Sequence, residues 1–319
     1  MNKINIFEKA DMINFANIHH ADFDGAISGA CIKAALPNVV SKSSGIPKAY
    51  QNMVPFLNDR SIDIIILSDL SIYDNDIKEH DLQSMLENDE IIIYDHHLSE
   101  NNNKLFGDGK IGKYSVLRED ICGATISFLE MMKYFPDNQK LKDLEEIVYF
   151  SDVYDMWRID NPDFLHSVKI NSLLDWKVGY TPDEFRERFL NNPDPYNFSN
   201  KELKIIEYKE RKHEKDLKTM EENAFLFEYK GLNVVMTESD AVDYTKMCFN
   251  NEVLKDFPDV DMFIYKYPNT KQCSVRIPEN SKVEDLNDWT DVFGCAGHAK
   301  AGGISGENIK KLEKVLAEI

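Results

Sequence analysis

The sequence predicts an α/β protein with a parallel-sheet N-terminal domain and a smaller α/β C-terminal domain. Two observations indicate this fold class. Apolar, β-branched runs alternate with helical patterns in the first half of the chain, and shorter strand patterns resume after a long charged helix. The chain has 319 residues, which is more than one hydrophobic core usually organises. Its hydrophobic content of 43% is enough to build two cores. We expect a first domain over 1–198, a linker helix over 199–224 and a second domain over 225–319.

Hydrophobic periodicity predicts the elements of the first domain. The run 62–67 is too apolar and β-branched for a half-exposed strand, so it indicates a central strand of a parallel sheet. Apolar positions before Asp152 recur every three or four residues, which predicts a helix that stops at the following acids. In chain order we expect strands at 13–18, near Val39, at 62–67 and at 91–94, helices at 26–35, 77–87 and 123–134, and helical pieces over 157–198. Such alternation builds a parallel sheet that binds ligands at the carboxyl ends of its strands.

The second domain begins after a highly charged helix over 199–222, which Ser199 or Asn200 would cap. Its basic residues interleave with acidic ones, so we interpret it as a solvated linker and not as a nucleic-acid patch. After it we expect strands at 225–227, 232–236, 261–267 and 273–277, with helices at 242–249 and 307–317.

Clusters of His and Asp follow the predicted strands. His20, Asp22 and Asp24 lie in a loop where Gly25 permits a close backbone approach, and Asp69 leaves the central strand at its carboxyl end. Polar groups are costly to bury unless they are paired or coordinated, so such clusters suit divalent-metal chemistry.

Two further clusters complete the set. Asp95, His96 and His97 follow the strand at 91–94. Asp152 and Asp155 follow the helix that the apolar periodicity predicts before Asp152. Mixed imidazole and carboxylate ligands, with no thiolate nearby, favour a borderline-to-hard ion such as manganese and leave magnesium, iron, cobalt and zinc open. A single ion could not use so many carboxylates, which favours two.

Each cluster taken alone would more often be a helix cap or a solvated turn. Five of the eight histidines, however, fall inside the motifs, which scattering would rarely produce: His19, His20, His96, His97 and His298. We therefore expect a metal site. His19, next to His20 on an extended segment, is expected to point to the other face and to be structural.

The ordered clusters resemble the four motifs of the DHH phosphoesterase superfamily. They read His-x-Asp-x-Asp-Gly at 20–25, Asp69, Asp-His-His at 95–97 and Ser-Asp at 151–152. The stretch Gly-Cys-Ala-Gly-His-Ala-Lys-Ala-Gly-Gly at 294–303 is similar to the Gly-Gly-Gly-His motif of the DHH-associated C-terminal domain, found in RecJ-type exonucleases and bacterial nanoRNases. Two glycines of that motif are replaced here, by Cys295 and Ala296.

The resemblance implies a ligand set for two divalent ions, most often Mn²⁺. The first ion would be held by His20, Asp22 and Asp69, and the second by Asp24, Asp69, His96 and Asp152. Asp69 would bridge the two ions. His97 is expected to contact a phosphate or donate a proton in the reaction, and Asp95 and Asp155 are expected to orient imidazole rings.

The second domain offers groups that suit a phosphate. Ser274-Val275-Arg276 resembles the strand that carries the substrate-binding arginine of related enzymes, and a guanidinium binds phosphate through two hydrogen bonds. A surface salt bridge is the alternative for Arg276. We expect the amides of a glycine loop at a helix start to assist, and this loop supplies Gly297, His298, Gly302 and Gly303. The active site would then be a cleft between the domains.

The charge balance limits the class of substrate that we expect. With 37 basic and 56 acidic residues the net charge is -19, which opposes the binding of long nucleic acid. We expect a manganese-dependent phosphodiesterase, a nanoRNase-like exonuclease that hydrolyses short oligonucleotides or linear dinucleotides to mononucleotides by two-metal in-line attack of hydroxide. The alternatives are a pyrophosphatase or polyphosphatase-like hydrolase and a non-catalytic nucleotide-binding relative.

The remaining composition agrees with a cytoplasmic protein that binds no membrane. No segment approaches ~18 consecutive apolar residues, and the N-terminus lacks the pattern of a signal peptide. The five cysteines form no Cys-x-x-Cys pair, so neither a disulfide framework nor a structural zinc is indicated. A homodimer is one state of assembly that the sequence leaves open.

Overall fold

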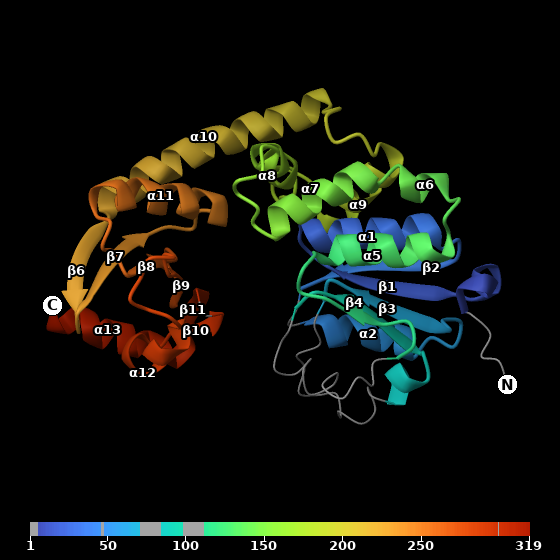
Figure 1. The fold of residues 1–319 in the computed structure, drawn as a ribbon, viewed down its shortest axis with the longest axis horizontal. Coiled ribbons are helices and arrows are strands. Elements are labelled where there is room, and N and C mark those ends of the chain that lie inside the picture. Colours follow the sequence, from blue (N-terminus) through green and yellow to red (C-terminus); the bar gives the residue numbers. More distant parts are fainter. Residues whose placement is uncertain (1–5, 46–47, 71–83, 98–111, 299) are drawn as a thin grey trace. The chain divides into compact units, whose positions relative to one another are not determined.

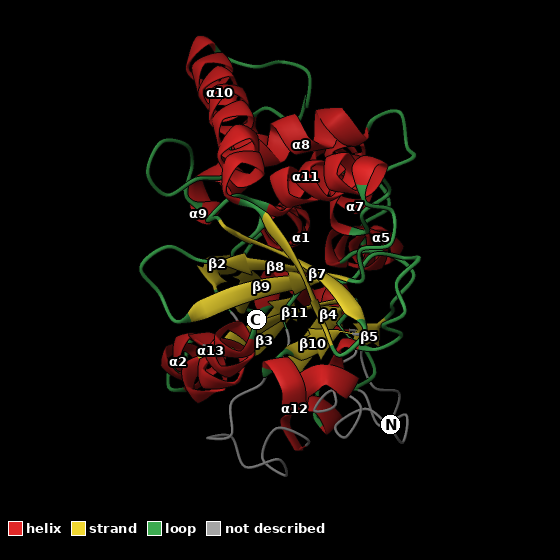
Figure 2. Cartoon of the chain, turned by 90° about the vertical axis from the view of Figure 1, so that its left-hand side faces the viewer, coloured by secondary structure: helices red, strands yellow, loops and turns green. Residues whose placement is uncertain are grey.

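The computed structural model describes residues 6–45, 48–70, 84–97, 112–298 and 300–319, with backbone alone at 296–298. The chain divides into two compact units, Met1–Ile206 and Glu207–Ile319 (Figure 1). The division falls inside α10 (Asn200–Asn223), which is one uninterrupted helix (Figure 2). No helix among the described residues has an apolar stretch that could cross a lipid bilayer.

The first unit contains a five-stranded parallel sheet with strand order β2-β1-β3-β4-β5, which confirms the predicted fold class. Its strands are β1 (Phe15–His20), β2 (Val39–Ser44), β3 (Ile64–Ser68), β4 (Ile91–Asp95) and β5 (Val116–Leu117). Every residue of β3 and β4 is buried, as expected for central strands of a parallel sheet. The carboxyl ends of β1, β3 and β4 therefore lie side by side at one edge.

Helices cover both faces of this sheet (Figure 1). Helices α1, α5, α7 and α9 lie on one face and α2 lies on the other, where separate apolar clusters fill the two interfaces. The helices are α1 (Phe23–Ala35), α2 (Ala49–Leu57), α5 (Gly123–Tyr134), α6 (Gln139–Lys142), α7 (Glu145–Asp155), α8 (Phe164–Ser172) and α9 (Pro182–Asn191), after a 3₁₀ helix at Ile6–Met12.

The observed helices of the first unit agree with the predicted ones in part. The helix predicted at 123–134 has the predicted bounds, whereas most of the one predicted at 77–87 lies outside the described residues. We predicted that the helix before Asp152 stops at the acids. Helix α7 instead continues through them to Asp155. The helical hydrogen bonds continue, since the amide of Met156 donates to the carbonyl of Asp152. Asp152 and Asp155 are thus almost one helical turn apart on the same helix.

The second unit is built on a six-stranded sheet of order β10-β11-β9-β8-β7-β6, in which only β7 and β8 pair in parallel among the described pairs. Its strands are β6 (Phe225–Tyr229), β7 (Leu232–Glu238), β8 (Met262–Lys266), β9 (Gln272–Arg276), β10 (Ala296–His298) and β11 (Ala301–Ser305). Its helices are α11 (Asp243–Asp256), α12 (Thr290–Phe293) and α13 (Ile309–Glu318), with 3₁₀ turns at Leu286–Trp289 and Gly306–Asn308. Apolar clusters lie on both faces.

The glycine-rich stretch corrects a prediction. We expected a loop at a helix start, but Ala296–His298 and Ala301–Ser305 form the antiparallel strands β10 and β11, and β11 pairs with β9. A Cβ atom at Gly303 would lie 3.1 Å from the carbonyl oxygen of Cys273 on β9, so a glycine suits this close strand approach. Within the described residues, Gly303 therefore serves strand packing, and Gly297 and Gly302 lie in paired strands and not in an amide nest at a helix terminus.

Candidate metal centre

The candidate metal centre lies where three neighbouring strands of the first unit end. His20 is the last residue of β1, Asp69 follows β3 directly, and Asp95 ends β4. The backbone N–H of Asp69 donates to the carbonyl of Tyr94 at 2.7 Å, which joins the ends of β3 and β4. Asp69 has a φ of 53°, in the left-handed region that non-glycine residues rarely adopt and that is frequent at functional sites.

Three groups of side chains bring ligand atoms within 4.8 Å of one another: His20, Asp22 and Asp69; Asp69, His96 and His97; and Asp24, His96 and Asp155. His20 Nδ1 lies 2.6 Å from Asp22 Oδ2 and 3.6 Å from Asp69 Oδ2. His96 Nε2 lies 3.2 Å from Asp69 Oδ1 and 3.3 Å from Asp155 Oδ2. The three groups overlap at Asp69 and His96, so they form one continuous cluster.

Asp69 lies at the middle of this cluster and is buried. Neither of its carboxylate oxygens makes a hydrogen bond of good geometry with a described residue, and the same holds for His96 Nε2, although the two side chains approach to 3.2 Å. Buried polar atoms almost always have partners, because leaving them unpaired costs free energy. Orphaned oxygen and nitrogen atoms that face one another are the donor set of a divalent cation, so these residues fit a metal.

The electrostatics of the cluster lead to the same conclusion. Burial, together with the charges of Asp24 and Asp22, raises the pKa of Asp69 well above its ordinary value. Burial and the same two carboxylates raise the pKa of Asp155 to about 9. These acids resist ionisation next to one another, and a bound cation would relieve that repulsion.

Asp24 is held rigidly at the start of α5. Its carboxylate accepts hydrogen bonds from the backbone N–H of Gly123 at 2.7 Å and of Ala124 at 2.8 Å, and from Ser151 Oγ at 3.0 Å. The charge thus satisfies the exposed amides of a helix N-terminus. A Cβ at Gly123 would lie 2.6 Å from Asp69 Cβ, so only glycine lets α5 begin this close to the centre.

Asp152 is the predicted ligand that the structure does not bring into the cluster. Its Oδ1 accepts the backbone N–H of Cys122 at 3.2 Å and its Oδ2 accepts Arg158 Nε at 2.6 Å. Asp155 joins the cluster instead, whereas we predicted it only as a carboxylate that orients a ring. The sequence signal that could have separated them is spacing. Asp155 lies four residues after Ser151, which bonds Asp24, and therefore on the face of α7 that reaches the centre.

Asp95 and His97 form a unit beside the cluster. The buried Oδ1 of Asp95 accepts the backbone N–H groups of His96 at 2.8 Å and His97 at 3.2 Å, and lies 2.8 Å from His97 Nδ1. Burial alone would lower the pKa of His97, but the hydrogen bond and charge of Asp95 outweigh it and raise that pKa. Asp95 therefore has the ring-orienting geometry expected of it.

In the second unit, Arg276 belongs to a cationic cluster. Its Nη1 donates to Ser274 Oγ and its Nη2 to Asp243 Oδ1, both at 2.9 Å. The same oxygen of Asp243 accepts Lys246 Nζ at 3.2 Å, and Lys246 also donates to the hydroxyl of Tyr267 at 3.3 Å. Two cations thus share one carboxylate oxygen. Lys246 is a candidate binding residue that the sequence did not suggest.

The glycine hairpin lies next to this cluster in the sheet. Arg276 pairs in register with Ala301, which pairs in turn with His298. Gly297 pairs with Gly302, and Gly303 with Ser274. The second-unit positions predicted to bind substrate, Arg276, Gly297, His298, Gly302 and Gly303, therefore lie on three neighbouring strands.

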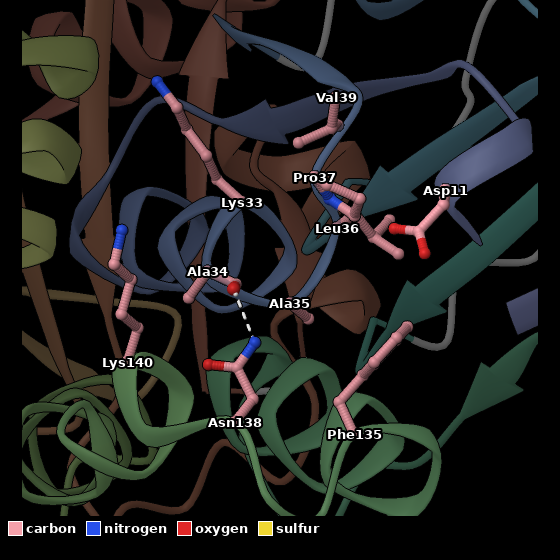
Figure 3. A pocket seen from close by; sticks show the side chains of 10 residues that line it. All are labelled: Asp11, Lys33, Ala34, Ala35, Leu36, Pro37, Val39, Phe135, Asn138 and Lys140. Carbon is pink, nitrogen blue, oxygen red and sulfur yellow. Dashed lines mark hydrogen bonds between the residues drawn. The ribbon is translucent and has the colours of Figure 1, made fainter.

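A surface cavity of about 540 Å³ lies elsewhere in the first unit (Figure 3). Its lining includes Lys33, Leu36, Val39 and Lys140, at the far end of α1 from His20. A helix of 13 residues separates the two ends of α1 by about 20 Å. None of the residues of the candidate metal centre lines this cavity.

Comparison with known proteins finds likeness in structure alone, since no family model and no curated protein matches the sequence. A DHH-domain protein described as a member of a family of ribosomal proteins is 14% identical, with a TM-score of 0.66, and the match covers 97% of this chain and 87% of that one. The exonuclease RecJ bound to manganese is 14% identical, with a TM-score of 0.59 and coverage of 98% and 93%. A pGpG-specific phosphodiesterase, PggH from Vibrio cholerae, is 14% identical, with a TM-score of 0.56 and coverage of 96% and 98%.

Proposed function

We propose that this chain, which has the fold of the DHH proteins, is a metal-dependent phosphodiesterase that hydrolyses short oligonucleotides or linear dinucleotides to mononucleotides. The observation that carries the proposal is Asp69, a buried carboxylate without a hydrogen-bond partner among the described residues, enclosed by imidazoles and other carboxylates. The likeness to RecJ bound to manganese and to a pGpG-specific phosphodiesterase supports both the metal and the substrate class.

Two divalent ions, most favourably Mn²⁺, fit the number of ligand atoms. We assign His20, Asp22 and Asp69 to one ion and Asp24, Asp69, His96 and Asp155 to the other. Asp69, at the end of a central strand, would be shared by the two ions. When bound, such ions activate water for displacement at phosphorus and neutralise the charge that develops there.

Side chains of each unit are assigned to binding the substrate. Asp95 orients the ring of His97 through Nδ1, and we assign His97 to contact a phosphate oxygen or to protonate the leaving group. In the second unit, the shared carboxylate leaves one of the two positive charges of Arg276 and Lys246 uncompensated, and this charge attracts a phosphate. The net charge of -19 disfavours long polymers and favours a substrate with few phosphates.

A direct test is an assay of the purified protein with a linear dinucleotide, a short oligomer and a long oligomer in RNA and DNA forms, and with pyrophosphate. Each is incubated with Mn²⁺, Mg²⁺ or a chelator. We expect mononucleotide release from the dinucleotide and the short oligomer with Mn²⁺, and none with the chelator. Preferential hydrolysis of pyrophosphate or of the long strand would contradict the substrate class, and turnover in the chelator would contradict the metal.

A further inference from the structure

His19 lies one residue before the candidate ligand His20, and its side chain is completely buried. Helix α1 packs directly on it, because a Cβ at Gly29 would lie 2.6 Å from His19 Cδ2. One turn earlier, a Cβ at Gly25 would collide with the carbonyl oxygen of His20. Two glycines four residues apart thus let α1 fit against the end of β1.

The hydrogen bonds of His19 determine its tautomer. Arg186 Nη1 lies 2.8 Å from His19 Nε2, nearer than Asp183 Oδ1 at 3.5 Å, and a guanidinium can only donate, so Nε2 accepts. The ring proton is then on Nδ1, which lies 2.8 Å from the carbonyl oxygen of His20 and donates to it. The ring therefore connects the guanidinium to the backbone of a metal ligand.

Arg186 is itself firmly held. It is 4% exposed, and its Nη1 contacts Asp183 Oδ1 at 2.7 Å and Ser41 Oγ at 3.0 Å, while its Nη2 donates to Glu187 Oε1 at 2.9 Å. Asp183 also accepts the backbone N–H of Ser43 at 3.2 Å. Arg186 thus links α9 to the two neighbouring strands β1 and β2.

We infer that Arg186 and His19 are positioning residues for the metal centre. Arg186 fixes the Nδ1–H tautomer of His19, and that N–H holds the carbonyl of His20 so that the His20 ring faces Asp22 and Asp69. The inference rests on the proposed metal binding. It means that α9, a helix that contributes none of the candidate ligands, orients the His20 side of the centre through Arg186. Groups that orient a metal ligand commonly contribute about 10- to 100-fold to metal affinity.

Two substitutions of His19 separate this role from simple packing. In His19→Asn the amide nitrogen stands near Nδ1, so the variant keeps the donor to His20 and loses the acceptor for Arg186. In His19→Gln the amide oxygen stands near Nε2, so the variant keeps the acceptor and loses the donor. Each variant loses one hydrogen bond, and the pair should lose similar thermal stability. We expect Mn²⁺ affinity, measured by calorimetric titration of the metal-free protein, to fall about tenfold in His19→Gln and less than about threefold in His19→Asn.

A purely structural role would make Mn²⁺ affinity fall equally in both variants, or in neither, and either result would overturn the inference. Arg186→Lys gives an independent test, because a lysine cannot reach all the partners of the guanidinium. It should weaken Mn²⁺ binding in His19-containing protein and have no further effect in His19→Gln. Failure of the wild-type protein to bind Mn²⁺ would instead refute the proposed function, so the two failures are distinguishable.

Discussion

Two buried carboxylates of the first unit have opposite surroundings. Asp69 has no hydrogen-bond partner among the described residues, whereas Glu202 in the first turn of α10 accepts the backbone N–H of Ser199 at 2.6 Å and Arg188 Nε at 2.8 Å. Burial and neighbouring carboxylates raise the pKa of Asp69. Burial alone would also raise the pKa of Glu202, but the Ser199 N–H and Arg188 outweigh it and lower that pKa. A buried acid without a partner therefore indicates a ligand site, whereas a buried acid with partners, such as Glu202, can be purely structural.

The largest effect is expected from Asp69→Asn, which removes the proposed bridging charge. Activity should fall by at least ~10³-fold, since the ions contribute several kcal/mol to the transition state. The metal-free variant should nevertheless be more stable than wild type, because it removes a carboxyl group whose ionisation is penalised by burial and by the neighbouring carboxylates. Initial rates with Mn²⁺ and thermal unfolding without metal measure the two effects. A variant that loses stability as well would make Asp69 a structural acid like Glu202.

The next effect distinguishes the two acids of α7. We expect Asp155→Asn to reduce activity and Mn²⁺ affinity by about 100-fold, because Asp155 lies in the cluster. Asp152→Asn is the matched control. Its carboxylate bonds Cys122 and Arg158, and this loss should cost less than about tenfold. The reverse order would restore the ligand set that the resemblance implied.

This pair of acids marks the limit of what the sequence could predict. Asp69 and His96 follow continuous apolar runs, and parallel strands of a sheet end at one edge, so their proximity was predictable. Asp152 and Asp155 both lie near the end of one helix. Which of them faces the centre depends on how far α7 continues and on the partner that Arg158 provides. The spacing from Ser151 favours Asp155, but this signal becomes usable only once the extent of α7 and the contact of Ser151 with Asp24 are known.

In the second unit, too, the roles of residues depend on contacts between distant parts of the chain. Arg276 could be selected by resemblance, but Lys246 is thirty residues away on α11 and meets it only through a shared Asp243. The glycine stretch was mistaken for a loop because glycine is depleted in strands. Its strand conformation follows from pairing with β9, which brings the backbone of Gly303 close to Cys273.

An intermediate effect is expected from this cationic cluster, where Arg276 and Lys246 share one carboxylate. Arg276→Ala and Lys246→Ala should each raise KM about tenfold with little change in kcat, because one charge-assisted hydrogen bond to phosphate contributes about 1.5 to 3 kcal/mol. Steady-state kinetics with the dinucleotide measure this. Lys282→Ala is the control, since Lys282 pairs with Asp261 outside the cluster. Unchanged KM values in both variants would leave Arg276 with the alternative role of a salt bridge to Asp243.

The smallest effect on activity is expected from Glu202→Gln, which should leave kcat and KM unchanged and lower the free energy of unfolding by about 2 kcal/mol at neutral pH. The pKa of Glu202 is lower in the folded protein than in the unfolded chain. Its charge therefore contributes fully to the free energy of unfolding above the ordinary carboxyl pKa of about 4.3, and this contribution is lost as the pH falls from there through the folded-state pKa. The stability difference between wild type and Glu202→Gln should therefore shrink in acid. Urea unfolding across this pH range measures it.

Glu222→Gln on the same helix provides the matched control for that series. Glu222 pairs with Lys218 at 3.8 Å, and both side chains are exposed, so its loss should change stability by less than about 0.5 kcal/mol at any pH. A Glu202→Gln difference that stayed constant in acid would mean that Glu202 stabilises the α9–α10 junction by packing and not by charge. The contrast with Asp69 would then no longer rest on charge pairing, and an unpartnered acid could no longer be used to distinguish a metal centre from an ordinary buried carboxylate.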